Sequence, residues 1–342
     1  MRVGLVGCGR IGGSAHVAAY LQAGMRVTAV CDYYDERAKR VASRLGAAVE
    51  KDAVRLAARE DVDLVDVATP PGTRAELLSA LFEVGKPVLA QKPLAYDLAT
   101  AQSIVDEADS KGVPLAVNQN ARWAPTHLVL FRWIESGDAG SVYAVHHHNR
   151  YREDVDTWYT RHPDYIFLDH GIHYFDLVRL LAQETPSAVS AVSGRRPGQV
   201  AASPLLYSVN TRFSSGTAPH VAMTFVNSVP GPSAYDYRLV VDGTRQSAVA
   251  SLSAVDVYSG EQEKRIVPKG EWVPDGFTGA LVSFVRHLRG EGPLPHAGRD
   301  HLRSLAVAAA AAKSASLDGE WVDVVQGSFG EARRPALADY LF

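Results

Sequence analysis

The sequence predicts an α/β domain with a parallel, doubly wound sheet, followed by an α+β domain with a largely antiparallel, open sheet. Two observations carry this prediction. In residues 1–120, apolar strand-like runs alternate with helix-like runs. In the rest of the chain, several short strand-like runs follow one another, separated by turns rich in Gly, Pro and Ser. The length of 342 residues also favours two domains over one.

The first domain is expected over residues 1–120. Its strands are expected at residues 2–6, 27–31, 64–68, 88–90 and 115–117, and its helices at 14–21, 35–45, 74–84 and 98–110. The loops between them are short, so each helix has to return the chain to the same edge of the sheet. The strands are therefore predicted to be parallel.

The second domain is expected over residues 121–325. Its helices are expected at 126–136, 169–181 and 298–317, and its strands at 142–149, 189–193, 205–213, 220–227, 237–241, 248–252, 255–258 and 320–325. Turns such as Ser214-Ser215-Gly216 favour antiparallel pairing, with helices covering one face of the sheet. Residues 326–342 form a tail that we expect to dock on a neighbouring subunit.

A glycine triplet follows the first strand and opens the first helix. In the pattern G-x-G-x-x-G, the first glycine permits a tight turn, the second lets the backbone approach a pyrophosphate, and the third lets helix and strand pack closely. An anion is favoured there by the N–H groups and dipole of the helix N-terminus. The turn is expected to bind the cofactor through Gly7, Gly9, Arg10, Ile11 and Gly12. The alternative is a capping turn without a ligand.

The second strand ends at Asp32, 20 residues after Gly12. At this spacing, an acid hydrogen-bonds the adenosine ribose diol of a dinucleotide. A carboxylate also repels a 2′-phosphate, so NAD is favoured over NADP, although the nearby Arg37 and Arg40 soften this preference. The alternative for Asp32 is a solvated residue at a strand end.

Two later strands end in residues suited to a ligand, because ligands of open parallel sheets bind at the carboxyl ends of the strands. Thr69 and Pro70 follow the strand at 64–68, and Gln91 and Lys92 follow the strand at 88–90. A lysine held there can hydrogen-bond a substrate hydroxyl and stabilise alkoxide character as a hydride leaves. The alternatives are a loop stiffened by proline and a solvated lysine.

A third group of polar residues lies in the helix expected at 169–181. Asp169 and His173 are four residues apart and share one helix face. An imidazole titrates near neutral pH and can take a hydroxyl proton, while the carboxylate orients it. The alternatives are a metal site and a surface acid–histidine pair.

Together these motifs resemble the Gfo/Idh/MocA family of nicotinamide-dependent oxidoreductases over nearly the whole chain. The family carries Glu-Lys-Pro where this chain has Gln91-Lys92-Pro93, and the family motif Asp-x-Gly-x-His is matched in full by residues 169–173. The resemblance implies that Lys92, Asp169 and His173 are catalytic, with His173 as the general acid/base. It also implies NAD-dependent hydride transfer to or from a secondary alcohol or ketone of a cyclic polyol, sugar or glycoside, in a homodimer or homotetramer.

The resemblance extends to residues that line the family's cleft. It implies cofactor contacts for Asn120 and Gln91, and substrate contacts for Arg122, Trp123, Trp158 and Tyr165. A purely structural hinge is an equal alternative for residues 118–125. Arg74 stands where the family often has histidine, and it either contacts a cofactor phosphate or is solvated.

Composition excludes several other classes of protein. The 35 basic and 38 acidic residues give no electrostatic case for nucleic acid or an anionic membrane. No apolar run reaches the length of a membrane span, no signal peptide is evident, and two cysteines suit the cytoplasm. His146, His147 and His148 alternate across a strand, so no metal is expected there. A non-catalytic NAD-sensing regulator and a carbonyl or imine reductase are the alternative functions.

Overall fold

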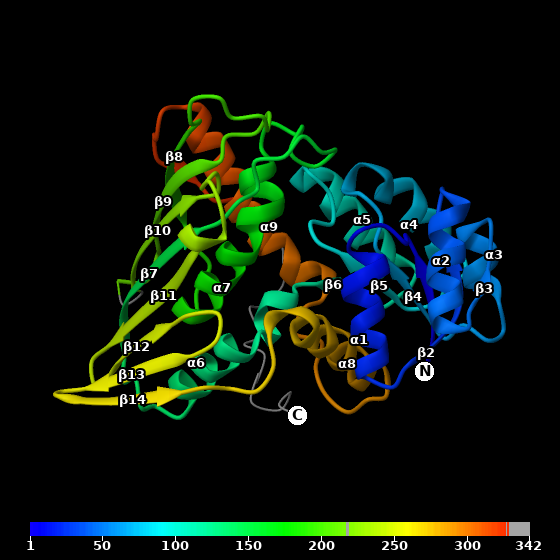
Figure 1. The fold of residues 1–342 in the computed structure, drawn as a ribbon, viewed down its shortest axis with the longest axis horizontal. Coiled ribbons are helices and arrows are strands. Elements are labelled where there is room, and N and C mark those ends of the chain that lie inside the picture. Colours follow the sequence, from blue (N-terminus) through cyan, green and yellow to red (C-terminus); the bar gives the residue numbers. More distant parts are fainter. Residues whose placement is uncertain (217–218, 326, 328–342) are drawn as a thin grey trace. The chain divides into compact units, whose positions relative to one another are not determined.

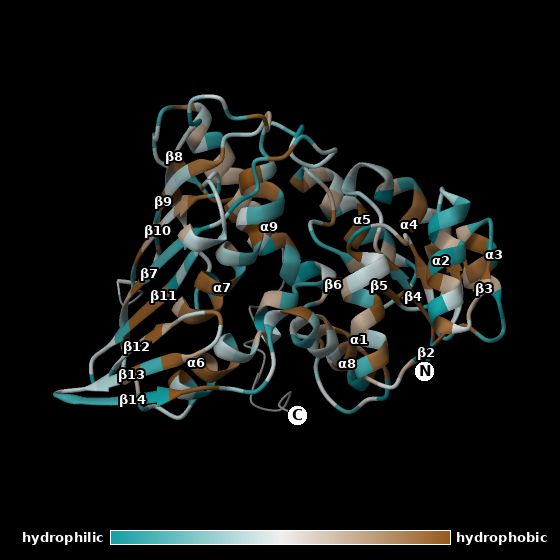
Figure 2. Cartoon of the chain, viewed as in Figure 1, coloured by the Kyte–Doolittle hydropathy of each residue, from teal (hydrophilic) through white to brown (hydrophobic). Residues whose placement is uncertain are grey.

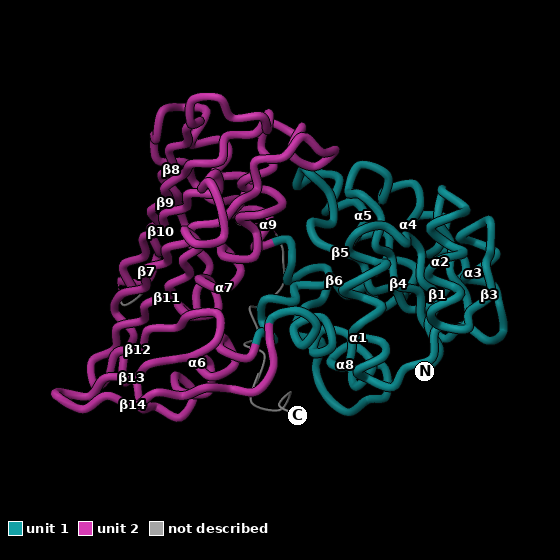
Figure 3. The backbone as a smooth tube through the Cα atoms, viewed as in Figure 1, with its two compact units in different colours: residues 1–124, 272–302 teal, residues 125–271, 303–342 magenta. Residues whose placement is uncertain are grey.

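The computed structural model describes residues 1–216, 219–325 and 327. The chain divides into two compact units (Figure 3). The first comprises residues 1–124 and 272–302, and the second comprises residues 125–271 together with the chain from 303 onward. The tail expected at residues 326–342 lies outside the described residues, apart from Gly327.

The first unit contains, within its described residues, a six-stranded parallel sheet in the order β3-β2-β1-β4-β5-β6 (Figure 1). Its strands are β1 (Arg2–Val6), β2 (Arg26–Cys31), β3 (Ala48–Val49), β4 (Leu64–Val67), β5 (Val88–Gln91) and β6 (Leu115–Asn118). The strand order reverses between β1 and β4, and ligands of such sheets bind at this point. The predicted parallel, doubly wound sheet is confirmed.

Helices connect these strands. They are α1 (Val17–Gln22), α2 (Asp35–Leu45), α3 (Ala53–Ala58), α4 (Arg74–Phe82) and α5 (Leu98–Ser110), with α8 (Phe277–Leu288) from the returning segment. The bounds of α2 and α5 match the sequence prediction. Asp97 caps α5 by accepting the N–H of Thr100 at 2.7 Å. Strand β3 and helix α3 were not anticipated, because elements of two and six residues show too little periodicity.

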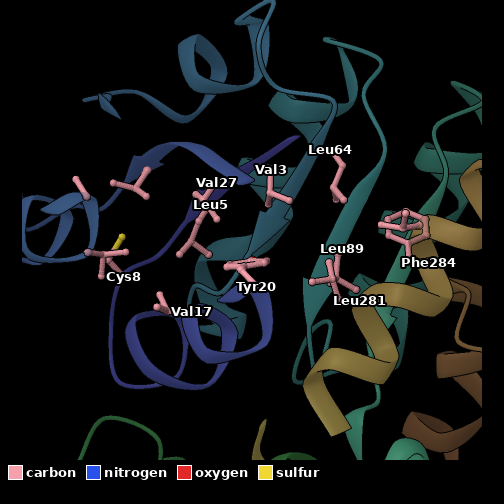
Figure 4. Close-up of a cluster of buried hydrophobic side chains, with 14 of the residues drawn as sticks. Val3, Leu5, Cys8, Val17, Tyr20, Val27, Leu64, Leu89, Leu281 and Phe284 are labelled. Carbon is pink, nitrogen blue, oxygen red and sulfur yellow. The ribbon is translucent and has the colours of Figure 1, made fainter. Parts of the chain in front are cut away.

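The core of the first unit combines distant parts of the chain. Val3 and Leu5 of β1 belong to the same buried cluster as Tyr20 of α1, and Leu281 and Phe284 of α8 belong to it as well (Figure 4). Residues 272–302 thus return to the first unit, whereas the sequence analysis placed them in the second domain. An amphipathic helix shows which face is buried but not which core it joins, so the sequence pattern could not locate α8.

The second unit contains, over its described residues, a nine-stranded sheet in the order β14-β13-β12-β11-β7-β10-β9-β8-β15. The strands are β7 (Val142–Arg150), β8 (Ala188–Gly194), β9 (Leu206–Arg212), β10 (His220–Val226), β11 (Asp236–Gly243), β12 (Ser247–Ala250), β13 (Val255–Ser259), β14 (Gln262–Ile266) and β15 (Val322–Asp323). Strands β7 and β10 pair in parallel, and the other neighbours pair antiparallel. The predicted, largely antiparallel sheet is confirmed.

The helices of this unit are α6 (Pro125–Glu135), α7 (Ile172–Ala182) and α9 (Gly298–Ser316), which begins in the first unit. Helix α7 packs on β7, and α6 packs on β12 and β13. The edge strand β14 is exposed and hydrophilic (Figure 2), and a charged edge of this kind discourages pairing with another chain. In β7, His147 is buried while His146 is exposed, as strand alternation requires.

No helix in the described parts of the chain is both long enough and apolar enough to cross a bilayer.

Candidate active site

In the glycine turn of the first unit, the surrounding backbone requires glycine at two positions, while at a third position a Cβ would meet no close protein atom. A Cβ on Gly12 would lie 1.9 Å from the carbonyl oxygen of Gly7, and Gly7 has a φ of +99°. At Gly9, by contrast, the nearest atom to a Cβ would be a guanidinium nitrogen of Arg37, 4.0 Å away. No neighbouring protein group requires glycine at position 9. The open space beside its Cα therefore suits a ligand group such as a pyrophosphate.

The helical segment after the turn is tied to the sheet by a buried acid. Residues Gly12–His16 form a π-helical turn that leads into α1. His16 Nδ1 lies 2.6 Å from Asp66 of β4, and the Tyr20 hydroxyl donates to the same carboxylate. Burial, and then the charge of Asp66, holds the pKa of Tyr20 well above its usual range. Sequence reasoning missed this network, whose only signal was a single acid inside an apolar strand.

Arg10 and Ile11 lie in the loop after β1, and Asp32 directly follows β2, as the sequence analysis expected. Arg10 is exposed, and Ile11 packs beside Phe277. The Asp32 carboxylate accepts the N–H of Cys8 at 2.7 Å and the N–H of Tyr34 at 2.8 Å. A carboxylate has about four lone-pair directions, so these two bonds leave capacity for a ribose diol.

The carboxyl ends of β4, β5 and β6 bring the other predicted cofactor residues to one edge. Gln91 is paired in register with Asn118, and half-buried Lys92 follows directly. The Gln91 side-chain oxygen accepts the N–H of Lys92 at 3.3 Å. Pro70 is exposed, while the Thr69 hydroxyl is buried with no hydrogen-bond partner among the residues described. An orphaned hydroxyl at this edge fits a bound polar ligand.

Arg74 differs from both alternatives that the sequence offered. Its side chain is 1% exposed, so it is neither solvated nor open to a cofactor phosphate. Instead the guanidinium donates to the backbone carbonyls of Gln91, Pro93 and Thr69. The predicted cofactor contact is therefore corrected to a backbone contact at the strand ends.

Three predicted cleft residues are likewise part of the protein interior. Arg122 is fully buried and pairs with Asp300 at 2.5 Å, and the ring of buried Trp123 lies edge-on to His296 at 4.8 Å. The Asn120 side chain accepts from Trp272 at 2.7 Å and donates to the carbonyl of Asn118 at 3.3 Å. The Arg122 guanidinium and the Asn120 amide are thus bonded to neighbouring protein groups, and the predicted ligand contacts of the three residues stay predictions.

In the second unit, Asp169 lies in a π-helical turn (Ile166–Gly171) and His173 lies in the first turn of α7. Both side chains are partly exposed, while Phe167, Leu168 and Ile172 beside them are buried. The Nδ1 atom of the His173 ring is itself buried. Gly171 between them is needed for close packing, since a Cβ there would lie 2.8 Å from the carbonyl oxygen of Ile166.

Other ionisable groups surround Asp169. Tyr165 is buried, and burial followed by the charges of Glu153 and Asp169 holds its pKa well above the usual range. Burial lowers the pKa of His162, and the charges of Asp164 and Asp169 oppose that shift. Sequence reasoning missed Glu153 and His162, since neither belongs to a motif.

The exposed aromatic side chain near this segment is Trp158. It is 55% exposed and lies edge-on to Tyr159 at 5.4 Å. An exposed indole of this kind can stack on an apolar face of a ligand. Its predicted substrate contact stays a prediction.

Helix α7 is fixed from its buried side. Asp176 is fully buried and accepts the hydroxyl of Ser304 in α9 at 2.6 Å and a guanidinium N–H of Arg179 at 3.3 Å. The hydrogen bond to Ser304 links α7 to α9.

No group of three or more His, Cys, Asp or Glu in the described part of the chain is arranged to hold a metal ion. His147 is buried against Tyr174, Phe225 and Tyr237, and burial holds its pKa well below the usual range. It is thus a neutral ring inside the sheet's packed face.

The first unit fits a dinucleotide. The open space at Gly9, the carboxylate of Asp32 and the orphaned Thr69 hydroxyl all lie at the carboxyl ends of strands near the switch point. The glycine turn would hold the pyrophosphate, and Asp32 would hold the adenosine ribose.

Comparison with known proteins agrees with this fit. Residues 1–119 match the model of an oxidoreductase family with an NAD-binding Rossmann fold, and residues 127–249 match the C-terminal domain of the Gfo/Idh/MocA family.

Relatives point to the same family, and a solved structure shares the fold. The chain is 27% identical to an inositol 2-dehydrogenase of Rhizobium meliloti, covering 92% of this chain and 96% of the relative. It is 32% identical to inositol 2-dehydrogenase 1 of Saccharopolyspora erythraea, covering 75% and 76%. An oxidoreductase from Agrobacterium radiobacter, solved with NAD+, L-tartaric acid and magnesium, superposes with a TM-score of 0.85 at 21% identity, covering 95% of this chain and 98% of that one. The chain belongs to the Gfo/Idh/MocA family of oxidoreductases, with an NAD-binding Rossmann domain at its N-terminus.

Proposed function

We propose that the protein is an NAD-dependent dehydrogenase acting on a secondary alcohol of a cyclic polyol, sugar or glycoside. One observation carries the proposal. The glycine turn, Asp32 and Lys92 all lie at the carboxyl ends of strands in one parallel sheet, so a dinucleotide held by the turn runs along the edge that carries Lys92. The inositol 2-dehydrogenases among the relatives support a polyol as the substrate class.

The proposed roles follow from the chemistry of each side chain. His173 takes the proton of the substrate hydroxyl, because a neutral imidazole is a competent base near neutral pH. Lys92 donates a hydrogen bond to the same oxygen and stabilises its developing negative charge. Asp169 orients His173 or a second hydroxyl. NAD, when bound, supplies the hydride acceptor.

Substrate contacts are proposed for two aromatic residues of the second unit. Trp158 presents an exposed face that can cover the apolar side of a ring, and Tyr165 lies beside Asp169. These contacts would select a cyclic substrate over an open-chain one.

The test is a turnover screen. Purified protein is incubated with NAD or NADP and a panel of inositols, sugars and glycosides, and nicotinamide reduction is followed by its near-ultraviolet absorbance. We expect turnover with NAD on at least one cyclic polyol or sugar. On that substrate, Lys92→Met and His173→Asn should each lower kcat on the order of a hundredfold or more.

Two outcomes separate the alternatives. Tight NAD binding without turnover on any alcohol, ketone or imine would favour a sensing regulator, whereas turnover confined to ketones or imines with NADH would favour a reductase. Wild-type kcat in either variant would remove that residue from the mechanism. We further propose a homodimer or homotetramer, which light scattering tests on the same preparation.

A further inference from the structure

One buried arginine holds the backbone on both sides of Lys92. Arg74 is the first residue of α4, and its side chain is 1% exposed. One terminal nitrogen, Nη1, donates to the carbonyl oxygens of Gln91 and Pro93, which directly precede and follow Lys92. The other, Nη2, donates to the carbonyl of Thr69 at the end of β4. The guanidinium therefore links the ends of two neighbouring strands and encloses the backbone of Lys92.

A second anchor lies one residue further along the chain. The N–H of Leu94 donates to Nε2 of His301 at 3.1 Å, and Nδ1 of that ring lies 3.0 Å from the side-chain amide of Gln119. The segment from Gln91 to Leu94 is thus fixed at three backbone positions, while the Lys92 side chain is half-buried.

Fixing this backbone matters because a lysine side chain is long and flexible. Its ammonium group sits at the end of a four-carbon chain with several rotatable bonds, so its position depends on where its Cα is held. A displacement of about 1 Å at a catalytic group can cost on the order of a hundredfold in rate. A planar guanidinium with five donors can bridge several carbonyls at once, which an ammonium or an imidazole cannot do in the same geometry.

We propose that Arg74 is a positioning residue for Lys92, acting through the carbonyls of Gln91 and Pro93. The proposal rests on the proposed role of Lys92 and adds a residue outside the motifs. It explains why an arginine is buried at this edge of the sheet. It predicts a larger effect of Arg74 loss on the chemical step than on cofactor binding, because two of its three hydrogen bonds go to the carbonyls that flank Lys92, and the third goes to Thr69.

The first experiment is Arg74→Lys, with kcat on the active substrate and the Kd for NADH measured on the same preparation. We expect kcat to fall about tenfold to a hundredfold, with the Kd for NADH within about threefold of wild type. The matched control is Arg59→Lys. Arg59 also makes three side-chain hydrogen bonds in the first unit, but to Glu50 and Asp61. Its kcat should equal that of wild type.

Chemical rescue and a double-mutant cycle test whether Arg74 acts through Lys92 or only stabilises the fold. Arg74→Ala should regain part of its kcat in guanidinium chloride, below unfolding concentrations, but not in ammonium chloride of equal ionic strength. In a Lys92→Met background, Arg74→Lys should have no further effect on kcat, because the two residues act as one unit. If Arg74→Ala does not fold, Arg74→Lys carries the cycle alone.

The results separate this proposal from the proposed function. Wild-type kcat in Lys92→Met would refute the role of Lys92 itself. Suppose instead that Lys92→Met lowers kcat as expected. If Arg74→Lys then keeps wild-type kcat, loses NADH affinity and kcat in parallel, or lowers kcat by the same factor in both backgrounds, Arg74 does not position Lys92.

Discussion

The two edges of the parallel sheet use arginine in different ways. At the amino edge, Arg2 pairs with Asp63 at 2.8 Å, and Arg59 pairs with Asp61 at 2.8 Å; each of these side chains remains between 29% and 42% exposed. At the carboxyl edge, Arg74 is buried and donates to three backbone carbonyls. The amino edge therefore contains ordinary surface ion pairs, while the carboxyl edge contains a buried support for the backbone.

This difference shows that the backbone is held in place by a buried side chain at the carboxyl edge of the sheet. Exposed ion pairs contribute about 0–1 kcal/mol each, because water screens the charges and the side chains lose entropy when they pair. A buried guanidinium without its acceptors would cost far more, so its burial is tolerated only where those acceptors are held in place. The edge that carries the glycine turn and Lys92 is thus the one where small changes should alter function.

The largest effect is expected at Gly12. Gly12→Ala places a Cβ 1.9 Å from the Gly7 carbonyl oxygen, so the turn must open and its NAD affinity should fall on the order of a hundredfold or more. Gly9→Ala meets no protein atom closer than 4.0 Å and should fold normally, yet still bind NAD more weakly. Calorimetric titration with NADH measures both. Unchanged affinity in Gly12→Ala would show that the cofactor does not use this turn.

A smaller effect is expected at Asp32. Asp32→Asn removes the negative charge that repels a 2′-phosphate, while Arg37 nearby lies 4.3 Å from the centre of the Tyr34 ring. The ratio of kcat/KM for NADP to that for NAD should rise about tenfold. Asp61→Asn at the amino edge is the matched control and should leave the ratio unchanged. If Asp61→Asn raises the ratio of kcat/KM for NADP to that for NAD as much as Asp32→Asn does, Asp32 has no specific role in cofactor choice.

The smallest effect is expected at the amino edge itself. Hydrogen bonding to Arg2 lowers the pKa of Asp63 to about 2 in the folded protein. A lowered folded-state pKa stabilises the protein above the unfolded value of about 4, and this contribution is lost as pH falls towards 2. Asp63→Asn should therefore cost at most about 1 kcal/mol near neutral pH. Chemical denaturation at several pH values should show that the difference in free energy of unfolding between wild type and Asp63→Asn shrinks in acid, with NADH affinity unaffected. A difference that stays constant between pH 4 and 2 would contradict the pairing of Asp63 with Arg2.

The sequence predicted the parts of this molecule that local patterns encode. The parallel strands, the bounds of α2 and α5 and the largely antiparallel second sheet follow from periodicity and turn residues. The positions of the glycine turn and of Asp32 follow from the G-x-G-x-x-G pattern and from the 20-residue spacing between Gly12 and Asp32.

Other features depend on contacts between distant parts of the chain. The return of α8 to the first core, the burial of Arg122 beside Asp300 and the pairing of His16 with Asp66 join residues 50 or more positions apart. Arg74 is the clearest case, since a surface charge and a buried backbone contact look identical in sequence. No local pattern distinguishes a buried polar residue with partners from an exposed one.

The most direct test of the central claim is a crystal structure of the protein with NADH and its active polyol or sugar. The account predicts that Lys92 Nζ and a ring nitrogen of His173 both lie within about 3 Å of the oxygen on the carbon that is oxidised. A complex in which either group lies beyond hydrogen-bonding reach of that oxygen, with no water between them, would contradict it.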